Sequence, residues 1–266
     1  MVSLTVGPGR WDPTCYQNNK SLPHFAVGTD ARHSHRNFAS GNERTPADLT
    51  PFIKSGKKVG LYLRKTDEYR YIIDLMNMNM HDSTVYLTMT YDFFDGPIKQ
   101  DWMDLLPVWF DADQCGMSDV KPLKEHGKFT VSSNPWTPVV EGEVVGMGTH
   151  LHDGGLALRI IVDNSTEACN SVARYGETLE YIFKMPMSNM HGPDVKIAEK
   201  HISSMSTCYF NDIGVRKMTK DQSWVLKGDY NYDEHPGNSE DGEPSEIMAI
   251  GIAYVAVPPD LKPPFE

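Results

Sequence analysis

The sequence has few cysteines, no long apolar run and a shortage of basic residues, and each of these features excludes a class of protein. Its 266 residues include 25 lysines and arginines against 36 aspartates and glutamates, which gives a formal net charge of -11. This balance argues against nucleic acid or an anionic membrane as a partner. No apolar stretch approaches the length that spans a bilayer, so we expect no transmembrane segment. The glycine-rich signatures of dinucleotide, nucleotide and α/β-hydrolase sites are also missing.

The four cysteines are too few and too far apart for a zinc knuckle or a thioredoxin-type site, because none lies in a CxxC pair. An even number fits two disulfides in an oxidising compartment, and three pairings are possible. We favour Cys15–Cys115 and Cys169–Cys208, since each half of the chain then has its own disulfide. These pairs predict a protein of the secretory pathway or the extracellular space.

Two further features bear on secretion. The sequons at Asn19 and Asn164 allow N-glycosylation of a secreted chain. The opening residues, "MVSLTVGPG", lack the basic and apolar regions of a signal peptide, and they predict a strand followed by a turn. We therefore expect that the natural start, with any signal peptide, lies upstream of this sequence.

Alternating apolar and polar residues predict β-structure almost throughout. Eighteen prolines and 21 glycines interrupt the strands at short intervals, as is typical of a sandwich or barrel. Helical periodicity is weak, with one short turn expected from Pro193. The predicted strands lie at 2–6, 68–80, 83–94, 156–164, 223–232 and 246–257.

The best domain boundary lies in the polar, turn-rich stretch 111–124, "DADQCGMSDVKPLK". It predicts a first β domain at 1–112 and a second at 113–266. The acidic, glycine- and proline-rich stretch 231–245, "NYDEHPGNSEDGEPS", predicts a long surface hairpin loop.

The most informative motif is "GTHLHDGG", in which His150 and His152 stand one residue apart. Side chains two apart on a strand share a face, so both imidazoles would point to the same place. Such a pair can simply face solvent, but the glycines around it leave room for a ligand, and Asp153 could donate or accept a supporting hydrogen bond. Met248 opens a strongly apolar strand, and two imidazoles with a thioether form a donor set that suits copper.

The other methionines and histidines receive plainer interpretations. Two methionine clusters resemble copper-handling stretches, but gap-filling apolar residues are the preferred explanation. A second HxH motif, "RHSHR", is interpreted as a polar loop, because its arginines would oppose a bound cation. Three further histidines without regular spacing are expected to be structural or exposed. The residues concerned are Met76, Met78, Met80, Met185, Met187, Met190, His33, His35, His191, His201 and His235.

Seven motifs together carry a family resemblance that covers nearly the whole chain: "ASGNERT", "DLMNMNM", "VYLTMTYDF", "THLHDGG", "CNSVARYG", "HISSMSTC" and "EIMAIGIAYVAV". With them the chain resembles fungal β proteins of the stress-up-regulated nodulin type. More remotely it resembles the peptidylglycine α-hydroxylating and dopamine β-monooxygenases.

The resemblance implies an all-β fold of two consecutive antiparallel jelly-roll sandwiches that face each other across a cleft, with the first truncated at its N-terminus. In the monooxygenases the second domain binds copper through an HxH pair and a later methionine, which implies His150, His152 and Met248 here. Their first domain holds an electron-transfer copper with a His-His pair and a third histidine. The pair would precede Met1 and the third histidine would fall near Met76, so two-copper hydroxylation is not expected.

Similar fungal proteins act as cyclases in secondary metabolism, and this predicts a cyclase of the Diels–Alder or hetero-Diels–Alder type. It would hold a small apolar polyene in the cleft without a cofactor, and His150, His152 and Asp153 would form the catalytic group that polarises a carbonyl. The alternative is a mono-copper protein or residual copper monooxygenase that uses His150, His152 and Met248. A non-catalytic extracellular β-sandwich that binds glycans or partners is the third hypothesis, and it ranks last because no exposed aromatic stripe can be identified in the sequence. The oligomeric state is left open.

Overall fold

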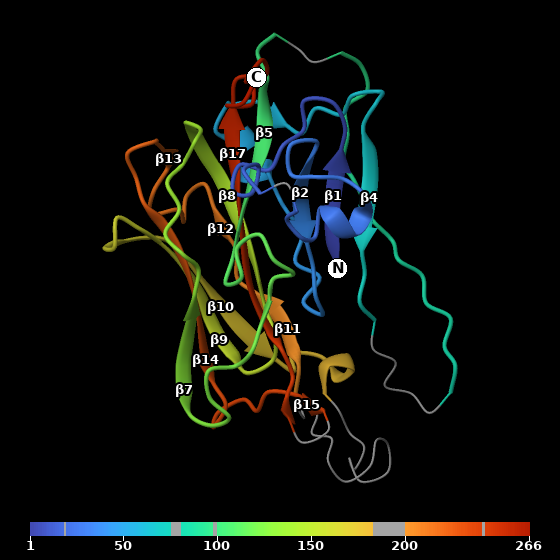
Figure 1. Cartoon of the computed structure of the whole chain (residues 1–266), viewed down its shortest axis with the longest axis vertical. Helices are drawn as coiled ribbons and strands as arrows, with labels where there is room; N and C mark the ends of the chain where they lie inside the picture. Colours follow the sequence, from blue (N-terminus) through green and yellow to red (C-terminus); the bar gives the residue numbers. More distant parts are fainter. Residues whose placement is uncertain (19, 76–80, 98–99, 183–199, 241–242) are drawn as a thin grey trace.

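The computed structural model describes residues 1–266 except 19, 76–80, 98–99, 183–199 and 241–242. Its regular structure is almost entirely β (Figure 1), as the sequence predicts. The helical elements are short: α1 (Thr50–Lys54) and the 3₁₀ turns η1 (Phe25–Val27) and η2 (Leu179–Tyr181). None of the described helices is long and apolar enough to span a membrane.

A seven-stranded sheet forms the middle layer, with β17 in its centre between β8 and β5. Nearly every residue of β17 is buried, which explains why its sequence is apolar on both faces instead of alternating. The members of this sheet are β3 (Val59–Gly60), β5 (Met103–Asp111), β6 (Asp119–Val120), β8 (Gly142–Leu151), β12 (Cys208–Tyr209), β13 (Lys217–Met218) and β17 (Ile247–Val257).

A five-stranded antiparallel sheet covers one face of this middle layer. Its strand β14 alternates buried and partly exposed residues, so one side packs inward. Leu158, Ile160 and Leu226 from this sheet pack against Leu151 and Ala249 of the middle layer, in the larger of two cores. The strands, in spatial order, are β11 (Ile202–Met205), β10 (Thr166–Tyr175), β9 (Gly155–Val162), β14 (Trp224–Asn231) and β7 (Lys128–Ser132).

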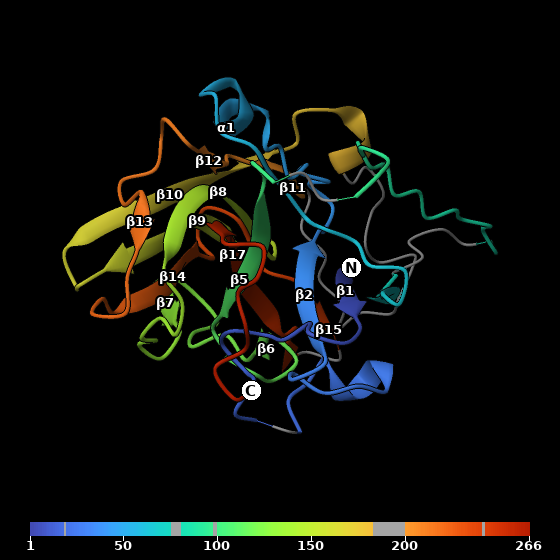
Figure 2. The same cartoon turned by 90° about the horizontal axis from the view of Figure 1, so that it is seen from above.

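The opposite face of the middle layer is covered by the N-terminal segment. It forms the three-stranded sheet β2-β1-β4 and helix α1, and Figure 2 shows this layer on the far side of β5 and β17 from β9 and β14. The smaller core joins Phe52 of α1 to Trp109, Ile250 and Ile252 of the middle layer. The strands are β1 (Val2–Val6), β2 (Ser34–Ala39) and β4 (Glu68–Ile72).

Five of the predicted strands are confirmed, as β1, β4, β9, β14 and β17, although β4 ends at Ile72, well before the predicted end at residue 80. The strand predicted at 83–94 is wrong: this segment has no strand, and its large side chains, such as Tyr86 and Phe93, are exposed. Alternation is a local property, whereas a strand also needs a hydrogen-bonding neighbour, and no strand of the described chain pairs with 83–94.

The predicted turn at Pro193 lies outside the described residues. The predicted hairpin loop 231–245 holds the short ladder β15 (Ser239–Glu240) with β16 (Glu243–Pro244).

The interpretation of "RHSHR" as a polar loop is also wrong. His35 is 2% exposed and lies in β2, opposite Thr5 of β1, while His33 is exposed and contacts Asp30. The flanking Arg36 is completely buried because two carboxylates neutralise it: its Nε lies 2.7 Å from Asp12 Oδ2 and its Nη1 lies 3.2 Å from Asp111 Oδ2. Arginine therefore marks the interior of the N-terminal layer here, not a loop.

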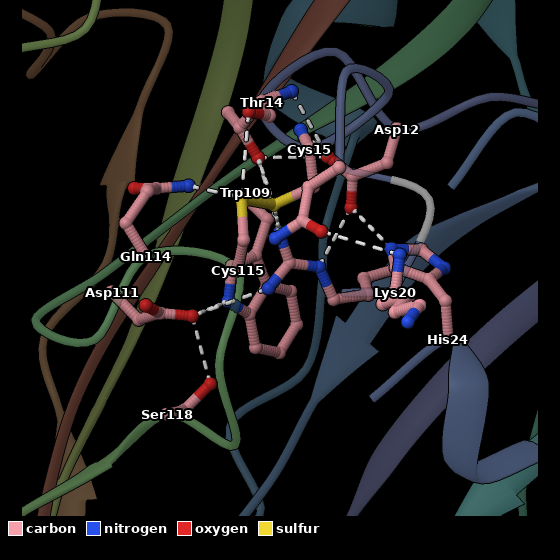
Figure 3. Close-up of a disulfide and its surroundings, with 12 residues drawn as sticks. Asp12, Thr14, Cys15, Lys20, His24, Trp109, Asp111, Gln114, Cys115 and Ser118 are labelled. Carbon is pink, nitrogen blue, oxygen red and sulfur yellow. Dashed lines mark hydrogen bonds and ion pairs between the residues drawn. A yellow bond between two sulfur atoms is a disulfide. The ribbon is translucent and has the colours of Figure 1, made fainter. Parts of the chain in front are cut away.

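Both favoured disulfides are present. Cys169–Cys208 links β10 to β12, and Cys15–Cys115 lies beside the buried charges just described (Figure 3). Figure 3 shows Asp12 and His24 on one side of this disulfide and Asp111, Ser118 and Trp109 on the other. This bridge fastens the N-terminal segment to the loop that follows β5.

The division into domains 1–112 and 113–266 remains a prediction. One structural fact bears on it: β5, which precedes residue 112, pairs with β17 along eight residues from Asp111 opposite Ile250 to Asp104 opposite Val257. A boundary at 112 would therefore cut between neighbouring strands of one sheet. We describe the fold as an all-β arrangement of sandwiched sheets.

Candidate metal site

Two adjacent strands of the middle layer carry the predicted ligands. Ile250 of β17 lies opposite His150 of β8, and the His152 amide donates to the Met248 carbonyl at 3.3 Å. Antiparallel pairing thus puts His152 across from Met248, two positions from His150 on the same face. Tyr230 donates a hydrogen bond to the same carbonyl at 2.7 Å and fixes the backbone of Met248. This face of the sheet looks toward the N-terminal layer, where Met248 packs at the edge of the smaller core.

Both imidazoles are anchored through Nδ1. His150 Nδ1 lies 3.0 Å from Glu43 Oε1, and His152 Nδ1 lies 3.0 Å from the backbone carbonyl of Glu246. A carbonyl only accepts hydrogen bonds, so His152 Nδ1 carries the proton, and a carboxylate imposes the same tautomer on His150. In the neutral form of each ring the lone pair lies on Nε2, for which no hydrogen-bond partner occurs among the described residues. The two rings stand 5.3 Å apart between centroids, with an angle of 77° between their planes.

The surroundings keep His152 neutral. Burial, with a smaller effect from the neighbouring His150, lowers the pKa of His152 to about 4, although the hydrogen bond to the Glu246 carbonyl acts in the opposite direction. At neutral pH the ring is therefore unprotonated and its Nε2 lone pair is available. A metal-binding histidine needs this state, and an Nδ1 hydrogen bond to a carbonyl or carboxylate is the usual support for it.

The donor set limits which metal fits. Throughout the described part of the chain, no three side chains drawn from histidine, cysteine, aspartate and glutamate are grouped as metal ligands. The ligand set of His150, His152 and the Met248 thioether therefore stays the prediction to compare with each metal. Two imidazoles with a soft sulfur suit copper, whereas zinc favours a carboxylate or thiolate as third ligand. The residues present fit copper.

Acidic groups surround this position. Asp119 of β6 pairs with Met248 on the other edge of β17. Burial and, to a smaller extent, the carboxylates of Glu246 and Asp74 raise the pKa of Asp119 to about 6. Glu43 is buried as well: burial raises its pKa, but the interaction with His150 outweighs this and leaves the pKa below its usual value. The local negative charge favours a cation.

Asp153 does not contact the pair. Its Oδ2 lies 2.6 Å from His201 Nδ1, and its Oδ1 accepts the Ile202 amide at 2.9 Å. The hydrogen bond that His201 donates to Asp153 raises the pKa of His201. Asp153 thus fastens the start of β11 to the loop after β8, so its support of the loop is structural, and its catalytic role stays a prediction.

A small pocket borders His150 on the side of the N-terminal layer. Its volume is about 20 Å³, roughly that of one water molecule. The residues that line it are mainly apolar: Ala39, Thr45, Pro46, Ala47, Gly148, Thr149, His150, Ile250, Ile252 and Tyr254.

The remaining predicted sites are away from this face. Asn164 is exposed in the tight turn between β9 and β10, where Asp163 and Asn164 have φ values of 52° and 60°. Positive φ at both central residues is typical of a type I′ hairpin turn, which asparagine and aspartate adopt most readily after glycine. Glycosylation of Asn164 remains a prediction. Asn19 and the six methionines of the two clusters lie outside the described residues.

Sequence reasoning missed Glu43 and Asp119. Glu43 stands in the motif "ASGNERT", which contributed to the family resemblance but received no role. No spacing rule connects it to His150, because the two residues are 107 positions apart.

Comparison with known proteins points to copper chemistry. Over 221 residues the chain is 28% identical to "Probable copper-dependent oxygenase clz3" of Cochliobolus lunatus, an alignment that covers 83% of this chain and 64% of the relative. It is also 28% identical over 221 residues to "Probable copper-dependent oxygenase M1" of Phoma sp. (strain ATCC 20986 / MF5453), covering 83% and 51%. The chain therefore spans between half and two thirds of the length of these relatives.

No family model matches the chain, and no solved structure matches it. The class of protein to which the chain is similar is thus that of fungal proteins named as copper-dependent oxygenases, at a remote level of relationship. The expected kinship with the nodulin type receives no support from these comparisons.

Proposed function

We propose that this chain is the copper-binding part of an enzyme similar to the copper-dependent oxygenases, with His150, His152 and Met248 as its ligands. One observation carries the proposal: both imidazoles are fixed through Nδ1, at 3.0 Å from Glu43 and from the Glu246 carbonyl, which leaves both Nε2 atoms for a metal on the face that Met248 shares. The names of the two fungal relatives support the same chemistry.

Copper held there would supply one-electron and dioxygen chemistry. The chain's own residues have separate tasks. Glu43 and the Glu246 carbonyl hold the rings, the β8–β17 pairing brings Met248 beside His152, and burial keeps His152 unprotonated. The substrate we expect is small and apolar, as in the prediction from the sequence. The two disulfides support a location in the secretory pathway or outside the cell.

Copper titration tests this function. The wild-type protein should bind one equivalent of copper, and the double variant His150→Ala/His152→Ala should bind none at that site. Met248→Leu keeps the side-chain volume but removes the sulfur, so it should weaken Cu(I) binding more than Cu(II) binding. His33→Ala, an exposed histidine outside the site, is the control. Equal copper uptake by the wild type and the double variant would rule the proposal out.

Cyclisation of a polyene, the other function suggested by the sequence, has less support. It needs a chamber of substrate size, whereas the pocket beside His150 holds about 20 Å³. The test is direct: metal-free protein that accelerates cyclisation of a polyene would favour this function, and a strict requirement for copper and a reductant would exclude it.

A further inference from the structure

A turn of the N-terminal layer closes over one of the proposed ligands. Glu43 is only 7% exposed, and its Oε1 accepts hydrogen bonds from two donors, His150 Nδ1 and the Gly41 amide, each at 3.0 Å. The carboxylate is thus held by its own turn while it holds the imidazole. Both contacts use the same oxygen, so the direction of the ring follows from the shape of the turn.

The turn has no room for a side chain at Gly41. A Cβ atom there would lie 2.3 Å from His150 Cε1, 2.7 Å from His150 Nδ1 and 2.7 Å from Glu43 Oε2. The glycine is required by this close approach of backbone to ring. Arg44 has a φ of 45°, an uncommon left-handed conformation for a residue with a side chain, and its amide donates to the Gly41 carbonyl at 3.4 Å.

Contacts from the rest of the chain fix the turn from outside. Tyr181 donates a hydrogen bond to the Asn42 carbonyl at 2.8 Å, and Tyr209 donates to the Pro46 carbonyl at 3.0 Å. A strained residue persists where the surroundings determine its conformation, and these contacts do so here. The turn is therefore a built support for the ring of His150.

The second carboxylate oxygen of Glu43 is placed to favour a positive charge, and the Met1 ammonium group already interacts with this carboxylate electrostatically. Oε2 is buried and has no hydrogen-bond partner among the residues that the structure describes. A buried carboxylate oxygen without a partner is unfavourable unless a positive charge lies nearby. No lysine or arginine side chain forms an ion pair with Glu43 in the described part of the chain, and His150 is its side-chain partner.

We propose that Glu43 is a positioning residue for the copper ligand His150. It fixes the tautomer with Nδ1 protonated, aims Nε2 at the face shared with Met248, and places a negative charge behind the ring that stabilises a cation on the other side. The Gly41–Arg44 turn holds Glu43 in that place. This inference rests on the proposed function, which supplies the cation.

The first measurement needs no copper. In metal-free wild-type protein, ¹⁵N NMR of the imidazoles should show His150 in the form protonated at Nδ1. Glu43→Gln keeps an oxygen that can accept from Nδ1 and should keep this tautomer, whereas Glu43→Ala should shift His150 toward the form protonated at Nε2. His150 protonated at Nε2 in the wild type, or unchanged in Glu43→Ala, would overturn the inference and leave the copper site itself untouched.

The second measurement is copper affinity, by competition with a chelator, together with the EPR spectrum of the Cu(II) form. Removing the partner of a metal-binding histidine typically lowers affinity 10- to 100-fold. We expect a loss of this size in Glu43→Ala, a smaller loss in Glu43→Gln, and altered hyperfine coupling in Glu43→Ala.

Glu143→Ala is the matched control. Glu143 lies on β8, the strand that carries His150, and its ion pair with Lys57 ties β8 to the N-terminal segment at the other end of the strand from the ligands. This variant should bind copper within twofold of wild type. If Glu43→Ala does not fold, Gly41→Ala takes its place, since its Cβ would displace the ring, and it should lower affinity by at least tenfold.

The proposed function and the role of Glu43 would be overturned by different results. Wild-type protein that binds no copper at His150 and His152 would overturn the proposed function. Wild-type binding with Glu43→Ala and Gly41→Ala both within twofold of it would overturn the role of Glu43 alone.

Discussion

Replacing Arg36 with methionine should be among the most destabilising single changes in the protein. Arg36 is fully buried and neutralises two buried carboxylates, with its Nε 2.7 Å from Asp12 Oδ2 and its Nη1 3.2 Å from Asp111 Oδ2. Its guanidinium also lies 4.7 Å from the centre of the Trp109 ring. Methionine fills similar space but leaves both carboxylates without a cation.

The magnitude follows from what remains around each carboxylate. Asp12 keeps the hydrogen bond with His24 Nε2 at 2.9 Å, and Asp111 keeps those from Trp109 at 2.6 Å and Ser118 at 2.8 Å. Burial already raises the pKa of Asp111, so this group can take up a proton when Arg36 is lost. The loss should therefore be that of one broken buried pair, about 3–5 kcal/mol, not of two.

Urea unfolding followed by tryptophan fluorescence, with both disulfides intact, measures this loss. Arg159→Met is the control, because Arg159 pairs with Asp229 at 2.7 Å on the partly exposed face of the second sheet. It should cost less than about 1 kcal/mol. Adding Asp12→Asn and Asp111→Asn to Arg36→Met should recover most of the stability, since no buried charge is then unpaired. Equal losses in Arg36→Met and Arg159→Met would refute the reasoning.

Two further predictions concern stability. Burial lowers the pKa of His35 to about 3, while an unfolded chain keeps the ordinary value near 6.5. The unfolded state therefore binds the proton first, and stability should fall as the pH drops from 6.5 to 3. His35→Phe should flatten that fall in thermal unfolding curves, and an unchanged slope would show that another group titrates. Cys169→Ala/Cys208→Ala opens a loop of 39 residues, for which chain entropy gives about 4 kcal/mol. We expect a loss of 2–4 kcal/mol in urea unfolding, and a loss below about 1 kcal/mol would contradict the entropic account.

Much of the fold could be predicted because most strands carry a local pattern of apolar residues that marks their buried side. β14 alternates along its length, and β17 is apolar throughout because both of its faces are covered. The same patterns gave wrong predictions where the structure depends on a partner from another part of the chain. Residues 83–94 alternate as well as β14 does, yet no described strand pairs with them. Arg36 looked like a loop residue because its two carboxylate partners, Asp12 and Asp111, are distant in sequence.

The residues of the candidate site could likewise be predicted only in part. His150 and His152 could be found from their spacing, since a strand puts residues two apart on one face, and Met248 came from the family resemblance and its soft sulfur. Glu43 could not be found, because its contact depends on a turn that crosses from one layer to another, 107 residues away from His150. The sequence also could not predict that both rings contact the protein through Nδ1 and leave Nε2 for a metal.

The position of β17 has a consequence for how the protein is made. It is the central strand of its sheet, yet it is the last strand in the sequence, after β5 and β8, which flank it. Until residues 247–257 have been synthesised and inserted, β5 and β8 each present an open hydrogen-bonding edge with apolar side chains. Such edges readily pair with other chains. A ribosome-bound or truncated product that stops before Ile247 would thus be prone to aggregate, and its HxH motif would lack Met248, the third of the proposed ligands.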